Sequence, residues 1–109
     1  MADRKLRVSK KRGEYMASDI SEITINYEEE GVLVVKELEK VVLTKGTWST
    51  IMYKYQQWDR NKNDYGPILY TIRRYQKRND VYWQKAKFNI SNNEQAQKIV
   101  DVLVRWIKE

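Results

Sequence analysis

The chain contains no cysteine and no histidine among its 109 residues. Without cysteine it cannot form a disulfide, a thiolate metal site or a thiol nucleophile. Without histidine it has no imidazole ligand for zinc and no imidazole base that could activate a serine. These two absences exclude most zinc sites and the commonest nucleophile–base pairs, so we expect neither a metal nor another cofactor.

Long apolar runs and glycine-rich loops are missing as well. No run approaches the roughly 18 apolar residues that a membrane-spanning helix needs, and residues 1–13 lack the apolar centre of a signal peptide. The chain has four glycines and one proline, and it lacks a glycine-rich phosphate loop. We therefore expect a cytoplasmic protein, nucleoid-associated if bacterial, with no membrane contact and no small-molecule substrate.

The best remaining candidates for metal binding or catalysis are three aspartates, Asp59, Asp64 and Asp80. The first two share a segment rich in turn formers, and Asp80 follows Asn79 in a second turn-like site. Aspartate is common in turns because its side chain accepts hydrogen bonds from nearby backbone. We therefore expect these residues to form turns, and we predict that the protein is not an enzyme.

Charge is plentiful, and it is distributed in blocks. Residues 1–13 carry six basic residues against one acidic residue, residues 14–45 carry a net charge of −5, and residues 46–90 carry a net charge of +6. Residues 1–20 are also polar and poor in apolar side chains, so we expect a disordered basic arm before one domain over residues 21–109. A basic region beside an acidic one creates a field that steers a polyanion to one side.

Alternating apolar and polar residues predict strands over 22–27, 47–58, 68–78 and 81–90. Residues 32–46 fit a strand or a helix, and we favour a strand because β-branched residues dominate. Ser91 and Glu94 then predict a capping box at the start of an amphipathic helix. The expected fold class is α+β: an antiparallel curved sheet of four to five strands followed by one C-terminal helix.

The hairpin over residues 68–90 has a predictable register. If Asn79 and Asp80 form a two-residue turn, residues whose numbers sum to 159 lie opposite each other. One face then holds most of the apolar side chains and should receive the helix. The other face holds a basic and aromatic set: Arg74, Arg78, Trp83, Lys85 and Lys87. Arg74 lies directly opposite Lys85 in this register, a repulsive pair that a phosphate would relieve.

The strand over residues 47–58 divides in the same way. Its odd positions Ile51, Tyr53 and Tyr55 suit a core, and its even positions suit the basic face. An aromatic ring stacks on an unpaired base, worth roughly 1–3 kcal/mol, while a cation contacts the phosphates. We therefore predict these nucleic-acid-binding residues: Trp48, Lys54, Trp58, Arg60, Arg73, Arg74, Arg78, Trp83, Lys85 and Lys87.

The order of these motifs resembles the single-stranded-DNA-binding domain of the transcriptional coactivator positive cofactor four. The resembling segments are Lys45-Gly46-Thr47-Trp48, the strand ending at Trp58, the turn-rich loop, the basic strand through Arg73 and Arg74, and KFNIS before the helix. The likeness covers roughly Val32 to Trp106, and the Pur and Whirly proteins share a related unit. It implies a homodimer whose curved sheets bind single strands through basic and aromatic residues, with the helices helping to form the dimer.

We therefore expect a homodimer that binds single-stranded DNA without catalysis, in transcription regulation or in the handling of exposed strands. A unit this short also gains stability from a partner. Two alternatives stay open. Sheet aromatics stack RNA bases equally well, so the ligand could be RNA. The tryptophans could instead bind a partner protein, because aromatic residues are enriched at protein interfaces.

Overall fold

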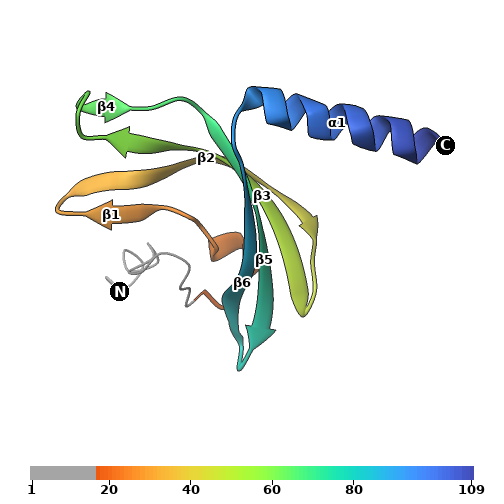
Figure 1. Cartoon of the computed structure of the whole chain (residues 1–109). Coiled ribbons are helices and arrows are strands. Elements are labelled where there is room, and N and C mark those ends of the chain that lie inside the picture. The colour runs from red at the N-terminus through yellow and green to blue at the C-terminus, as the bar shows by residue number, and fades with distance from the viewer. Residues whose placement is uncertain (1–16) are drawn as a thin grey trace.

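The computed structural model describes residues 17–109 as a curled antiparallel sheet followed by one helix (Figure 1). Five strands lie side by side in the order β1 (Tyr27–Glu29), β2 (Val32–Thr44), β3 (Trp48–Asp59), β5 (Leu69–Arg78) and β6 (Val81–Ile90). The short strand β4 (Asp64–Tyr65) pairs with the end of β3, and the helix α1 spans Asn93–Lys108. The predicted α+β class is confirmed.

The ambiguous segment after Gly31 forms a strand, as predicted. Glu30 and Gly31 both have positive φ angles, 48° and 81°, which suits a two-residue turn between β1 and β2. The prediction of a strand over residues 22–27 is only partly right. Residues Ile20–Glu22 form a short 3-10 helix, residues 23–26 belong to no helix or strand, and β1 starts at Tyr27.

Residues 17–26 form a segment that we call the strap, which crosses one face of the sheet. At the β6 edge, the Ala17 carbonyl accepts a hydrogen bond of 2.9 Å from the Tyr82 N–H. At the β2 edge, the Glu37 carboxylate accepts hydrogen bonds from the Thr24 hydroxyl and the Ile25 N–H. The Lys40 ammonium there donates to three strap carbonyls, those of Ile20, Ser21 and Ile23. The strap therefore ties the two sides of the curled sheet together.

The core lies between the strap and the face of the sheet beneath it, which we call the strap face. Ile51, Tyr53 and Tyr55 of β3 are 0%, 1% and 5% exposed, as their odd positions predicted. The Tyr75 hydroxyl lies 2.8 Å from that of Tyr53, and burial raises the pKa of Tyr75 to about 12. From the strap, four apolar side chains enter this core: Ala17, Ile20, Ile23 and Ile25.

The disordered basic arm was expected to extend to residue 20, but this packing includes the last four of its residues in the fold. Ala17 and Ile20 are 2% and 9% exposed, so residues 17–20 belong to the folded unit. Residues 1–16, which hold the rest of the expected arm, lie outside the described residues. The strap also replaces the helix as the cover of the sheet, because its apolar side chains fill the place that α1 was expected to take.

The hairpin of β5 and β6 follows the predicted register only near its turn. Asn79 and Asp80 have φ angles of 54° and 64°, and the four pairs from Arg78–Val81 to Tyr75–Gln84 lie as predicted. A β-bulge at Lys85 then shifts the register by one residue, so that Arg74 faces Ala86. The predicted pair of Arg74 with Lys85 is therefore wrong. The bulge also exchanges the faces of the remaining β6 side chains.

The C-terminal helix is present where predicted, but its cap lies one residue later. The Asn92 side chain accepts a hydrogen bond of 2.8 Å from the Gln95 N–H, and the Gln95 side chain accepts one from the Ser91 N–H. Helix α1 points away from the sheet (Figure 1), and none of its residues is buried. The expectation that the helix packs on the hairpin is therefore wrong. Among residues 17–109, no helix is both long and apolar enough to cross a membrane.

Candidate nucleic-acid interface

The face of the sheet opposite the strap, which we call the open face, carries the even-numbered side chains of β3 and β5. The register aligns these side chains in rows that run across the strands. One row consists of Trp48 on β3, Gln76 on β5 and Trp83 on β6. Neighbouring strands lie about 4.8 Å apart, so the backbone positions of Trp48 and Trp83 are about 10 Å apart, with Gln76 between them in the ladder.

Two arginines flank this row on β5. The Arg74 guanidinium lies 4.5 Å from the centre of the Trp48 ring, within the range of a cation–π contact. Arg78 lies two residues further along β5, beyond Gln76 on the same face. Both arginines are exposed, and neither forms an ion pair within residues 17–109. We call Trp48, Arg74, Gln76, Arg78 and Trp83 the hairpin cluster.

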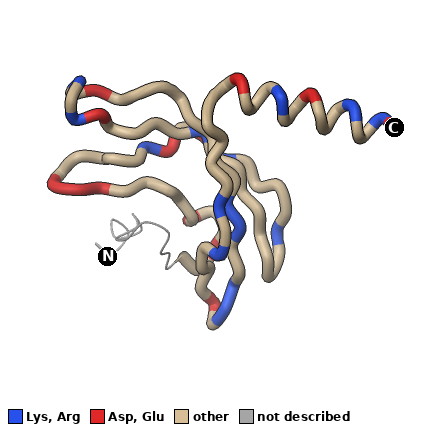
Figure 2. The backbone as a smooth tube through the Cα atoms, viewed as in Figure 1, with Lys and Arg blue, Asp and Glu red and all other residues tan. Residues whose placement is uncertain are grey.

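The indoles of the hairpin cluster remain accessible to solvent. Trp48 is 40% exposed, and Trp83 is partly exposed. Lysine and arginine residues gather along β5 and β6, whereas the acidic residues Glu28, Glu29 and Glu30 lie at the β1–β2 turn (Figure 2). The cluster therefore combines open aromatic rings with a local excess of positive charge.

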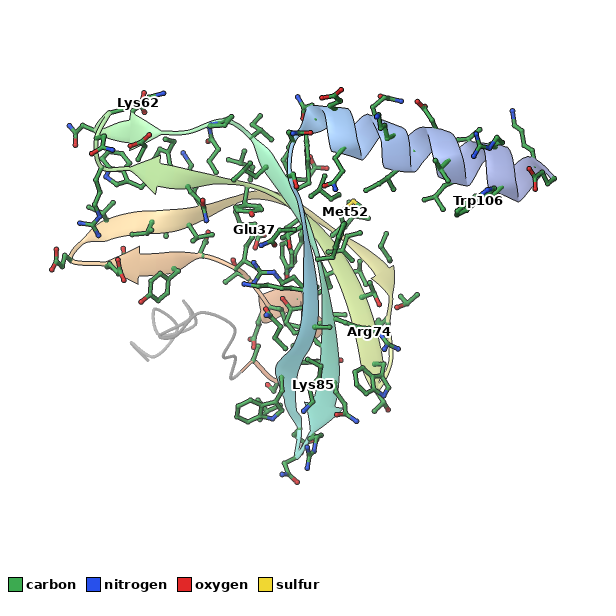
Figure 3. The ribbon with its side chains drawn as sticks, viewed as in Figure 1. Glu37, Met52, Lys62, Arg74, Lys85 and Trp106 are labelled. Carbon is green, nitrogen blue, oxygen red and sulfur yellow. The ribbon has the colours of Figure 1, made fainter. Side chains whose placement is uncertain are left out.

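Three of the predicted binding residues lie apart from the row of tryptophans. The Arg73 guanidinium lies on the strap face and donates hydrogen bonds to the Thr71 hydroxyl and the Gln84 side chain. Lys87 pairs with Arg73 in the ladder, and the bulge therefore places it on the strap face as well. Lys85 is the bulged residue itself and remains exposed on the hairpin (Figure 3).

The other predicted residues lie further along β3. Trp58 is ten residues from Trp48, a distance of about 33 Å along a strand. Its ring packs edge-on against Tyr65 with the ring centres 5.0 Å apart. Lys54 forms an ion pair of 3.5 Å with Glu39, and Arg60 forms one of 3.2 Å with Glu29. Each of these three side chains thus already has a partner within the fold.

An apolar row crosses the middle of the open face. Val41, Met52, Ile72 and Phe88 lie opposite one another in register on β2, β3, β5 and β6. Val41 is 49% and Phe88 is 51% exposed. The sequence did not predict this row, because the bulge at Lys85 moves Phe88 from the expected core face to the open face.

Helix α1 presents a second exposed apolar surface. Leu103, Trp106 and Ile107 are 47%, 59% and 77% exposed. Part of this surface forms a shallow apolar groove of about 310 Å³ along the helix, lined by Ile99, Val102, Leu103 and Trp106 among others. Figure 3 shows Trp106 on the side of α1 turned toward the sheet and Met52 on the side of the sheet turned toward α1.

Gln76 is the one residue of the hairpin cluster that the sequence analysis did not select. The predicted register already placed it opposite Trp83, and this part of the register is correct. Its position between two indoles is the signal that identifies it. Among residues 17–109, no cluster of three or more acidic side chains could hold a metal ion.

Comparisons with protein-family models, with curated proteins and with solved structures found no match to this chain. The resemblance to the coactivator family therefore rests on the sequence motifs alone and remains a hypothesis.

Proposed function

We propose that the protein binds single-stranded DNA at the hairpin cluster without catalysis, in transcription regulation or in the handling of exposed strands. The row of Trp48, Gln76 and Trp83 between two arginines carries this proposal. Exposed indoles stack on unpaired bases, and guanidinium groups neutralise phosphates. Such a surface favours an unpaired strand, because the faces of duplex bases are already stacked on one another.

Each part of the cluster has a distinct role in this proposal. Trp48 and Trp83 each stack one base, and Gln76, which lies between them in the ladder, offers an amide that can hydrogen-bond a base edge. The contact between Arg74 and the Trp48 ring restricts that ring before DNA arrives. A ring that is already ordered loses less entropy on binding. Arg78 contacts the phosphates on the other side of the row.

We also propose that the working unit is a homodimer joined through α1 and the apolar row. Ten of the twelve large exposed apolar side chains within residues 17–109 lie on α1, on the second half of β2 or at Phe88. Exposed apolar surface that is concentrated in this way marks an interface. The helix leaves the open face of its own sheet uncovered, so a two-fold axis would bring the two surfaces of one copy against those of a second.

The test of the proposed binding is a titration of the intact protein with a poly-thymidine strand and with a duplex of equal length. Tryptophan fluorescence serves as the signal, and two salt concentrations separate phosphate contacts from stacking. We expect tighter binding of the single strand and weaker binding at higher salt. Equal affinity for strand and duplex would contradict stacking on the cluster. A matched RNA strand decides between DNA and RNA.

A further inference from the structure

The second half of β2 is an unpaired edge of the sheet. Strand β1 pairs with β2 only as far as Val35, and the strap meets β2 at Glu37 and Lys40. Residues 41–44 pair with β3 on one side, and no strand within residues 17–109 pairs with their other side. The backbone donors and acceptors of such an edge are a template for pairing with a further strand.

This edge lacks the charges and prolines that commonly protect exposed strands. Residues 41–44 read Val-Val-Leu-Thr. The side chains of Val41, Val42 and Leu43 are large, apolar and exposed. Because the edge is apolar as well as unpaired, it is better suited to a partner strand than to solvent.

The charges next to this edge limit how β2 can pair with a second β2. In an antiparallel pair around a two-fold axis, one residue lies opposite its own copy. Two bulges confine the regular part of this strand to residues 39–42. Glu39 or Lys40 at the axis would place like charges opposite each other, which is destabilising. Only Val41 and Val42 avoid this repulsion.

The apolar row distinguishes the two valines. Val41 is the outer member of this row on the open face, whereas Val42 aligns with the buried Ile51 on the strap face. Resting on the homodimer of the proposed function, we propose that β2 pairs antiparallel with β2 of a second copy, with Val41 at the two-fold axis. The four side chains of one apolar row then continue into the four of the other.

This pairing also places the two hairpin clusters on one surface. The two-fold axis is perpendicular to the joined sheet, so the open faces of both copies lie on the same side. A DNA strand that is long enough then contacts both clusters, and its second contact becomes intramolecular. The second copy thus supplies half of the proposed binding surface.

The absence of cysteine from the chain allows a direct test of the pairing. In Val41→Cys the two thiols face each other across the axis, with Cα atoms about 4.5–5.5 Å apart, within the range of a disulfide. In the matched control Val42→Cys the two Cα atoms are offset along the strands and lie about 8 Å apart, beyond this range. Mild oxidation and non-reducing electrophoresis should reveal a linked dimer for Val41→Cys alone.

A charge-exchange experiment tests the same axis without a disulfide. Val41→Lys and Val41→Asp each place like charges at the axis and should each weaken association at least about tenfold. An equal mixture of the two variants should restore association, because residue 41 of one copy meets residue 41 of the other. Sedimentation velocity measures association, and far-UV circular dichroism checks that each variant, changed at an exposed position, is folded.

Two outcomes would overturn the pairing and leave the proposed dimer intact. One is a native dimer that Val41→Cys fails to link or that Val42→Cys links instead, and the other is no gain of association on mixing. A monomeric native protein would overturn both proposals.

The shared binding surface has its own readout. The linked Val41→Cys dimer should bind poly-thymidine more tightly once the strand is long enough to reach both clusters, whereas Val41→Lys should lack this gain. The same length dependence in both variants would refute the shared surface. Failure of all variants to bind the strand would refute the proposed DNA binding and not the pairing of β2.

Discussion

The strap and the C-terminal helix both flank the sheet, yet only the strap packs on it. The strap has almost no regular structure, but Ile23 and Ile25 are 0% and 6% exposed. Helix α1 is regular and amphipathic, yet none of its residues is buried. A helix satisfies its own backbone hydrogen bonds and can stand away from the fold, whereas the strap needs Lys40 and Glu37 as partners for its backbone.

The largest expected effect tests this contrast through stability. Ile23→Ala removes a fully buried side chain and should lower the free energy of unfolding by about 2–5 kcal/mol. Ile107→Ala changes a side chain that is 77% exposed and should lower the stability of the isolated subunit by less than about 0.5 kcal/mol. Urea unfolding at low protein concentration measures both. Equal losses would mean that the helix packs on its own sheet in solution.

The second prediction concerns the helix in the proposed dimer. Trp106→Ala should weaken association by about 2–4 kcal/mol if Trp106 anchors the interface, a loss of about 30-fold or more. Sedimentation velocity over a range of concentrations reports this change, and far-UV circular dichroism checks the fold. Lys62→Gln, on the loop between β3 and β4, is the control and should leave association unchanged. A native protein that is monomeric at all concentrations would refute the dimer.

The third prediction uses the buried tyrosine of the strap face. The pKa of Tyr75 is raised to about 12 by burial, from an ordinary value of 10.0. Between these values the unfolded chain loses the proton while the folded chain keeps it, so stability is complete below pH 10 and falls as pH rises toward 12. The loss is on the order of 2 kcal/mol. In Tyr75→Phe the loss of stability between pH 10 and pH 12 should be smaller by this amount. An unchanged dependence of stability on pH would show that Tyr75 does not cause the loss.

The fourth prediction compares the tryptophans of the hairpin cluster with Trp58 at the far end of β3. Trp48→Ala and Trp83→Ala should each weaken single-strand binding by about 1–3 kcal/mol, because each removes one stacking ring. Trp58→Phe should leave the affinity unchanged, since Trp58 packs against Tyr65 and lies far from the cluster. Fluorescence anisotropy of a labelled strand gives the three affinities. A large loss of affinity in Trp58→Phe would show that the binding site extends along the whole of β3.

The smallest expected effect separates two neighbouring arginines on opposite faces. Arg74→Gln should lower the logarithmic salt slope of binding by about 0.7, the contribution of one phosphate contact. Arg73→Gln should leave the slope unchanged and lower the stability instead, because Arg73 donates hydrogen bonds to Thr71 and Gln84. Equal changes of the salt slope in the two variants would show that both faces of the sheet contact the DNA strand.

The local patterns of the sequence predicted much of this molecule. Strand alternation identified the buried positions Ile51, Tyr53 and Tyr55, and Asn79-Asp80 correctly predicted the hairpin turn. Both signals are local, because a side chain's face and a turn's shape depend on a few neighbouring residues. The placement of Trp48 and Trp83 on one exposed face follows from the same alternation.

Long-range packing determined the features of the fold that the local patterns did not predict. One bulged residue, Lys85, moves Phe88 to the open face and Lys87 to the strap face, and no local pattern announces it. The cover of the sheet depends on competition between the strap and the helix for the same apolar surface. The strap prevails because Lys40 and Glu37 satisfy its backbone while its isoleucines fill the core. Such a competition is a property of the whole chain, so only the tertiary structure could resolve it.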